Sequence, residues 1–99
     1  MILMRFSDGL FCPTAVCDEC GCEITDASAA MYAWFTNEGS DSTMYVLHKP
    51  CSYPFESKNK HLATGAYPSM MWDELKELTK FLSNNMGVKS GTKKGENFL

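Results

Sequence analysis

The sequence predicts a small α+β domain in which an antiparallel β-hairpin precedes a C-terminal amphipathic helix. Three observations lead to this fold class. A chain of 99 residues has the length of one ordinary domain. Two short runs rich in aromatic and apolar residues flank a polar turn in the middle of the chain. Close to the C-terminus, apolar residues recur at the spacing of one helix face.

The hairpin is expected from two strands, over 30–36 and 43–48. The segment 37–42 between them is rich in turn-forming residues, so the second strand is expected to fold back on the first. Residues 1–16 mix apolar side chains with turn residues, and they are expected to form a loose strand that leads into the first cysteines.

The C-terminal helix is expected over 70–86. One stripe of its surface is apolar and contains Met71, Leu75, Leu78 and Leu82. Ser69 is placed to cap the first turn, and Gly87 suits the left-handed conformation in which many helices end. The polar, turn-rich segment 55–69 before the helix is expected to be irregular.

Charge and hydropathy indicate which classes of protein the sequence does not favour. The formal net charge is −3, so the overall charge does not favour a general phosphate-binding surface. No apolar run is long enough to span a bilayer, and Asp8 interrupts the first one too early for a secretory signal. These features predict a cytoplasmic chain with no membrane partner. One domain is expected over 1–88, followed by a flexible tail rich in Gly, Ser and Lys over 89–99.

The cysteines are the most informative residues in the sequence. There are five of them: Cys12, Cys17, Cys20, Cys22 and Cys51. An odd number without an export signal argues against a disulfide framework, because the cytosol keeps thiols reduced. Dense cysteines in a reducing compartment indicate metal binding or thiol chemistry.

The sequence contains two pairs of possible metal ligands, and in each pair two other residues separate the ligands (x-x spacing). Cys17 and Cys20 form the first pair, and Gly21 follows them where a tight turn favours positive φ. His48 and Cys51 form the second pair, and the hairpin between the pairs returns the chain to its starting point. Four nitrogen and sulfur donors satisfy a tetrahedral Zn²⁺, so the sequence predicts one zinc ion held by these four residues.

Two cysteines remain outside this set. Cys22 is an alternative to Cys20, although the x-x spacing and the glycine favour Cys20. Cys12 is expected to be a small apolar filler rather than a ligand. Four protein ligands leave no position for water or substrate, so the site is expected to be structural and the protein is not expected to be an enzyme.

The spacing Cys17-x-x-Cys20-Gly21 followed by His48-x-x-Cys51 resembles a treble-clef or zinc-ribbon knuckle, as in the first zinc half of LIM domains. Together with a Trp-bearing strand and a C-terminal helix, it is also similar to small bacterial and phage zinc-binding proteins of uncharacterised function. The resemblance implies a zinc site and a fold, and it implies no activity.

The aromatic residues suggest where function lies. Tyr32 and Trp34 share one face of the first hairpin strand, and Trp72 lies toward the flank of the helix stripe. Most of the aromatic residues are expected to form the core, and these three are the candidates for contact with a partner, so that the zinc domain acts as an adaptor for another protein or for itself. The alternatives are a nucleic-acid-binding zinc module, with lysines near 58–60 and in the tail on phosphates, and a thiolate-based redox or metal sensor.

Overall fold

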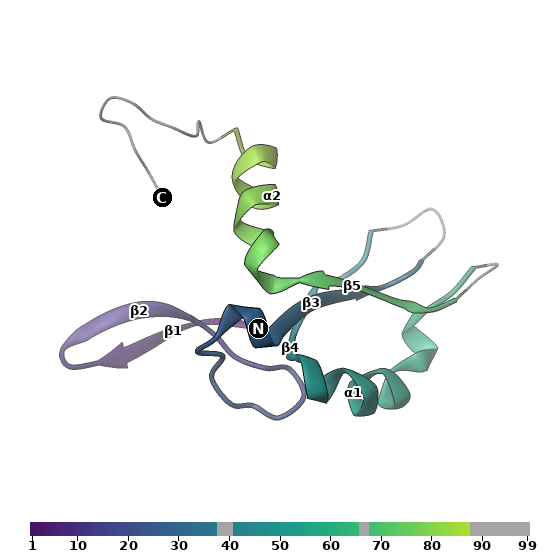
Figure 1. The fold of residues 1–99 in the computed structure, drawn as a ribbon, viewed down its shortest axis with the longest axis horizontal. Helices are drawn as coiled ribbons and strands as arrows, with labels where there is room; N and C mark the ends of the chain where they lie inside the picture. Colours follow the sequence, from purple (N-terminus) through teal and green to yellow (C-terminus); the bar gives the residue numbers. More distant parts are fainter. Residues whose placement is uncertain (38–40, 66–67, 88–99) are drawn as a thin grey trace.

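The computed structural model describes residues 1–37, 41–65 and 68–87 (Figure 1). Its elements, in chain order, are β1 (Ile2–Ser7), β2 (Leu10–Ala15), a 3₁₀ helix (Ala27–Ala29), β3 (Ala30–Phe35), β4 (Tyr45–His48), a 3₁₀ helix (Lys49–Cys51), α1 (Ser52–Lys58), a 3₁₀ helix (Lys60–Leu62), β5 (Met70–Glu74), a 3₁₀ helix (Leu75–Glu77) and α2 (Leu78–Asn85). The predicted α+β class is confirmed. The expected tail at 89–99 and the domain boundary at 88 lie outside the described residues.

Residues 1–16 form a two-stranded antiparallel ribbon, so the expectation of one loose strand is wrong. The chain reverses at Asp8 and Gly9, which both have positive φ, 52° and 78°. A two-residue turn with positive φ at both positions matches the natural twist of paired strands, and Asp-Gly is a favoured sequence for it. Pro13 pairs with Met4, where the alternation of the ladder points the proline nitrogen at the outer edge of β2.

The central sheet has three strands in the order β4-β3-β5, all antiparallel. The predicted β3–β4 hairpin is confirmed, although three residues of its expected turn, 38–40, lie outside the described part. One face of this sheet carries the core. The buried residues of this core cluster are Cys17, Met31, Ala33, Phe35, Leu47 and Phe55.

Helix α1 covers that face, so the expectation of an irregular segment over 55–69 is wrong for its first residues. Phe55 is the buried anchor of the helix, and its ring lies 6.1 Å from that of Phe35 and 5.1 Å from that of Tyr45. Pro54 sits in the first turn of α1, where backbone N–H groups have no partner within the helix. The proline therefore breaks no helical hydrogen bond.

The C-terminal helix is shorter than expected, because residues 70–74 form strand β5 instead of its first turns. β5 pairs with the open edge of β3, and Thr36 extends this pairing by donating its N–H to the Ser69 carbonyl (3.0 Å). Ser69 therefore caps no helix. The helical part begins at Leu75 and ends at Asn85, and the predicted role of Gly87 is confirmed by its φ of 79°.

Two elements extend away from the central sheet in Figure 1: the β1–β2 ribbon on one side and α2 on another. Neither ribbon strand contains a buried residue, and neither does α2. The buried core is therefore built without the ribbon strands or α2. Among the residues described, no helix is long and apolar enough to cross a membrane.

Candidate metal centre

The first ligand pair lies in a tight knuckle between β2 and β3. Val16 and Glu23 bridge its two sides, and the Cys17 N–H donates to the Cys22 carbonyl at 2.9 Å. Within this loop the Gly21 N–H donates to the Cys17 carbonyl at 2.9 Å. Gly21 has a φ of 76°, so the sequence-based reason for a glycine at this position is confirmed.

The second ligand pair lies where β4 passes into α1. His48 is the last residue of β4, and Cys51 ends the short 3₁₀ helix that leads into α1. Asp18 attaches the knuckle to β4 by two hydrogen bonds. The Asp18 N–H donates to the Val46 carbonyl, and the Val46 N–H donates to the Asp18 carboxylate, each at 2.8 Å.

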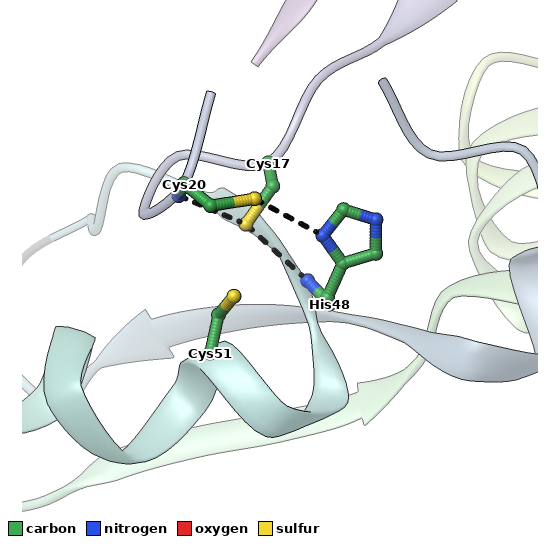
Figure 2. Close-up of side chains that lie close together, drawn as sticks. All are labelled: Cys17, Cys20, His48 and Cys51. Atoms are coloured by element: carbon green, nitrogen blue, oxygen red, sulfur yellow. Dashed lines mark hydrogen bonds between the residues drawn. The ribbon is translucent and has the colours of Figure 1, made fainter. Parts of the chain in front are cut away.

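The four donor groups of Cys17, Cys20, His48 and Cys51 converge on one point (Figure 2). Their ligand atoms all lie within 4.8 Å of one another, and the Cys20 Sγ is 3.4 Å from the His48 Nδ1. Two sulfurs bound at about 2.3 Å to a tetrahedral Zn²⁺ are roughly 3.8 Å apart. The folded backbone alone therefore brings the four groups to the size of a metal site.

Backbone amides stabilise negative charge on the Cys17 sulfur. It accepts hydrogen bonds from the N–H groups of Glu19 (3.4 Å), Cys20 (3.5 Å) and His48 (3.4 Å). Desolvation raises the pKa of the Cys17 thiol, but the three N–H groups, together with a hydrogen bond to the His48 side chain, outweigh it and hold this pKa below its ordinary value. The pKa of Cys20 is also lowered, first by a hydrogen bond from the Cys22 backbone. The knuckle thus favours thiolates.

Cys51 shows the opposite effect. Desolvation, followed by hydrogen bonding and charge repulsion with Cys17, raises the pKa of Cys51 to about 12. Three thiolates within a few ångströms repel one another, so without a cation one of them keeps its proton. A divalent cation at the centre removes this conflict, because its charge stabilises every thiolate around it. The chemistry of the donor set therefore fits a bound metal ion.

The two remaining cysteines that fall outside the predicted set also lie outside the cluster. The exposed Cys22 thiol donates to the Cys20 carbonyl at 3.9 Å, and hydrogen bonding and charge repulsion with Cys20 raise its pKa. Cys12 is exposed on β2, so it does not fill the core as expected. The structure thus brings together the same four residues that the sequence spacing predicts as ligands.

Two lysines near the site are paired with carboxylates. Lys58 lies 2.7 Å from Glu19, and Lys49 lies 2.8 Å from Glu74. Lys49 adjoins His48 in sequence, but its ammonium group is paired with a carboxylate of β5. Asp18 is the residue that sequence reasoning missed. The sequence feature that indicates its role is its position directly after the first cysteine, because a carboxylate there can accept a hydrogen bond from a neighbouring strand.

The three aromatic residues predicted to contact a partner do not form one surface. Tyr32 and Trp34 stack with ring centroids 5.7 Å apart and are half-buried on one face of the sheet. Trp72 pairs with Ala33, so it lies on the opposite face, where it is exposed. Tyr32 also approaches Asp73, with its hydroxyl 3.5 Å from the carboxylate.

Comparison with protein-family models, with curated proteins and with solved structures finds no match for this chain. The resemblance to LIM-type zinc sites thus remains a prediction that rests on ligand spacing.

Proposed function

We propose that this chain is a zinc-stabilised interaction module of the cytoplasm, in which one structural zinc ion maintains a fold that binds another protein or a second copy. The observation that carries the proposal is the convergence of three sulfurs and one imidazole nitrogen, all within 4.8 Å.

The donor set favours zinc over other common metals. Thiolate and imidazole ligands suit Zn²⁺, whereas Ca²⁺ and Mg²⁺ take oxygen ligands. A Cys₃His set with x-x spacing in both pairs is also common among structural zinc sites. The low pKa of Cys17 supports the same assignment, because the metal binds the thiolate form.

A structural role is supported by the closed ligand set. Four protein donors fill a tetrahedral shell, which leaves no position for a reacting water. Glu19, which adjoins Cys20 in sequence, is paired with Lys58. The ligands come from the knuckle, from the end of β4 and from the start of α1, so one ion joins three parts of a small core.

An interaction role is supported by the apolar surface outside the core. Large apolar side chains are exposed on the β1–β2 ribbon, on β5 and on α2, among them Phe6, Phe11, Trp72 and Phe81. Large exposed apolar patches mark contact sites in folded proteins. Nucleic-acid binding finds less support, because Lys49, Lys58 and Lys80 each face a carboxylate.

The metal is tested by native mass spectrometry of protein produced with zinc. We expect one Zn²⁺ per chain, and a thiolate-to-metal absorption band when Co²⁺ replaces it. Cys17→Ser is expected to lose the metal, whereas Cys22→Ser keeps it. A metal-free wild type, or loss of metal from Cys22→Ser alone, would contradict the assignment.

The interaction role is tested separately from the metal. Zinc-loaded protein is expected not to bind single-stranded or double-stranded oligonucleotides, even at low salt, where phosphate contacts are strongest. Binding that weakens steeply as salt is added would replace the proposed role with nucleic-acid recognition. The same preparation, analysed for bound proteins by mass spectrometry, identifies any heterologous partner.

A further inference from the structure

One face of the β1–β2 ribbon is entirely apolar. Residues that pair across the ladder share a face, so the register assigns six residues to this side: Ile2, Met4, Phe6, Phe11, Pro13 and Ala15. We call this set the hairpin apolar face. The opposite side is mixed and contains Leu3, Arg5, Ser7, Leu10, Cys12 and Thr14.

The hairpin apolar face is uncovered in the single chain. Its four large side chains, Ile2, Met4, Phe6 and Phe11, are all exposed. Phe6 and Phe11 contact each other across the ladder, with ring centroids 5.0 Å apart. An isolated two-stranded ribbon is marginally stable in water, and it needs packing on one face to persist. The ribbon therefore presents a surface that requires a cover.

The chain carries a second uncovered apolar surface. On α2 and at its C-terminal end, residues at helical spacing form the α2 stripe, which consists of Leu78, Phe81, Leu82 and Met86. The last three are exposed, and no residue of α2 is buried. Figure 1 shows the helix and the ribbon leaving the body in different directions, so in this structure neither covers the other.

We propose that a second copy of this chain covers both surfaces. The hairpin apolar face of one copy packs on the α2 stripe of the other, and a two-fold axis repeats the contact. This step rests on the proposed function, because it takes the exposed apolar surface as the interaction surface of the module. A ribbon with one apolar face and a helix with one apolar stripe are the two parts of a standard sheet-on-helix packing.

The area available supports a partner that uses both surfaces. A whole aromatic side chain buries about 150–250 Å², so Phe6 and Phe11, which are about two-thirds exposed, offer roughly 200–330 Å², and Ile2 and Met4 add to this area. A stable interface buries about 800 Å² per partner. The hairpin apolar face falls short of this alone, and the α2 stripe supplies the remainder. A second copy brings both surfaces at once.

The charges also favour a second copy. The formal net charge is −3, but the ribbon carries one cation and one anion, Arg5 and Asp8, which cancel. On α2, Lys80 pairs with Glu77. Two acidic chains can therefore meet through these elements without strong repulsion. An anionic membrane surface would instead meet an acidic protein with a single arginine on the apolar ribbon.

The experiment measures the dimer dissociation constant of the zinc-loaded full chain by sedimentation equilibrium. We expect a dimer. Phe11→Arg and Leu82→Arg are each expected to raise the constant by about tenfold or more, because a buried arginine would lack a partner. The matched controls are Leu10→Arg and Asn84→Arg. Leu10 is 65% exposed and Phe11 67%, but Leu10 lies on the mixed face, and Asn84 lies away from the α2 stripe.

Mixing the two disruptive variants tests the arrangement. A heterodimer of Phe11→Arg with Leu82→Arg keeps one intact contact, between the unmodified ribbon of one chain and the unmodified helix of the other. We expect the mixture to associate more tightly than either variant alone. Failure of the mixture to do so would overturn the hairpin-on-helix packing, since a hairpin-on-hairpin dimer offers no such intact contact.

The same samples separate this inference from the proposed function. A wild type that carries one Zn²⁺ but stays monomeric up to about 1 mM overturns the second-copy proposal and leaves the metal site standing. A wild type without zinc contradicts the proposed function directly. Binding of monomeric protein to phosphatidylcholine vesicles, lost in Phe11→Arg, would replace the second copy with a lipid surface.

Discussion

Asp18 and Val46 hold the two halves of the metal site together through a reciprocal pair of hydrogen bonds. The backbone of Asp18 donates to the Val46 carbonyl, and the Asp18 carboxylate accepts from the Val46 N–H, each at 2.8 Å. One residue thus satisfies both backbone groups of its partner. Because Asp18 follows Cys17 and Val46 precedes His48 by two residues, the pair sets the distance between the ligand pairs without touching the metal.

Replacing Asp18 should destabilise the fold. Asp18→Ala leaves the N–H of the buried Val46 without its partner, and an unsatisfied buried donor costs about 1–3 kcal/mol. Asp18→Asn keeps an acceptor oxygen and is expected to lose less. Urea denaturation of both metal-loaded variants measures the free energy of unfolding. Equal losses in the two variants would show that the carboxylate charge, which also lies 2.9 Å from the Met1 amino group, matters more than the bond to Val46.

Removal of the metal should unfold most of the domain. Structural zinc binds with an apparent free energy of about 10–16 kcal/mol at neutral pH, which exceeds the net stability of most small domains, about 5–15 kcal/mol. Circular dichroism is expected to show loss of structure on addition of a strong chelator and recovery on addition of excess Zn²⁺. A spectrum that does not respond to the chelator would show that the core folds without the ion.

Gly21 should influence metal affinity through backbone conformation alone. Its φ is 76°, and a Cβ at this position would meet no heavy atom within 4 Å. Gly21→Ala is therefore expected to cost about 1–2 kcal/mol of left-handed strain and to weaken Co²⁺ binding by roughly 5–30-fold. Gly9→Ala is the matched control, because Gly9 has a φ of 78° but lies in the ribbon turn. Equal losses of metal affinity would contradict a local role for Gly21.

Phe55 should contribute most of the packing between α1 and the sheet. It is 6% exposed and contacts the rings of Phe35 and Tyr45, so Phe55→Ala is expected to destabilise by about 3–5 kcal/mol. Tyr53 lies on the same helix at 79% exposure, and Tyr53→Ala should change stability by no more than about 0.5 kcal/mol. Thermal unfolding of the zinc-loaded variants compares the two. A small effect at Phe55 would show that the metal alone holds α1 in place.

The local parts of the fold were predictable from the sequence. The spacing of Cys17 with Cys20 and of His48 with Cys51 identifies the cluster, because few backbone geometries bring x-x pairs together. The β3–β4 hairpin follows from two apolar runs around a polar turn, since the pairing partners are close in sequence. Gly21 and Gly87 predict backbone positions with positive φ, because residues with a side chain adopt such values only at an energetic cost.

The long-range parts were not predictable from local patterns. Residues 70–74 precede Leu75 and continue the same helical spacing of apolar residues. Their strand conformation depends on the open edge of β3, which lies 35–43 residues earlier in the chain. Tertiary pairing overrides helical propensity at such a place. Asp8 and Gly9 are typical turn residues, but the weak alternation of the flanking residues conceals the two strands that they connect. Asp18 was missed because its partner, Val46, becomes a neighbour only in the folded chain.

Pro13 sets a limit on how far these molecules can grow into larger assemblies. The ribbon has two outer edges, and an exposed edge is a template on which further chains can add as strands. Because the proline lacks an N–H and its nitrogen faces outward, the β2 edge cannot continue a regular ladder, and only the β1 edge remains open. A strand ladder that can extend from one side only ends after a single addition. The ribbon can therefore expose an apolar face without nucleating the growth of fibres.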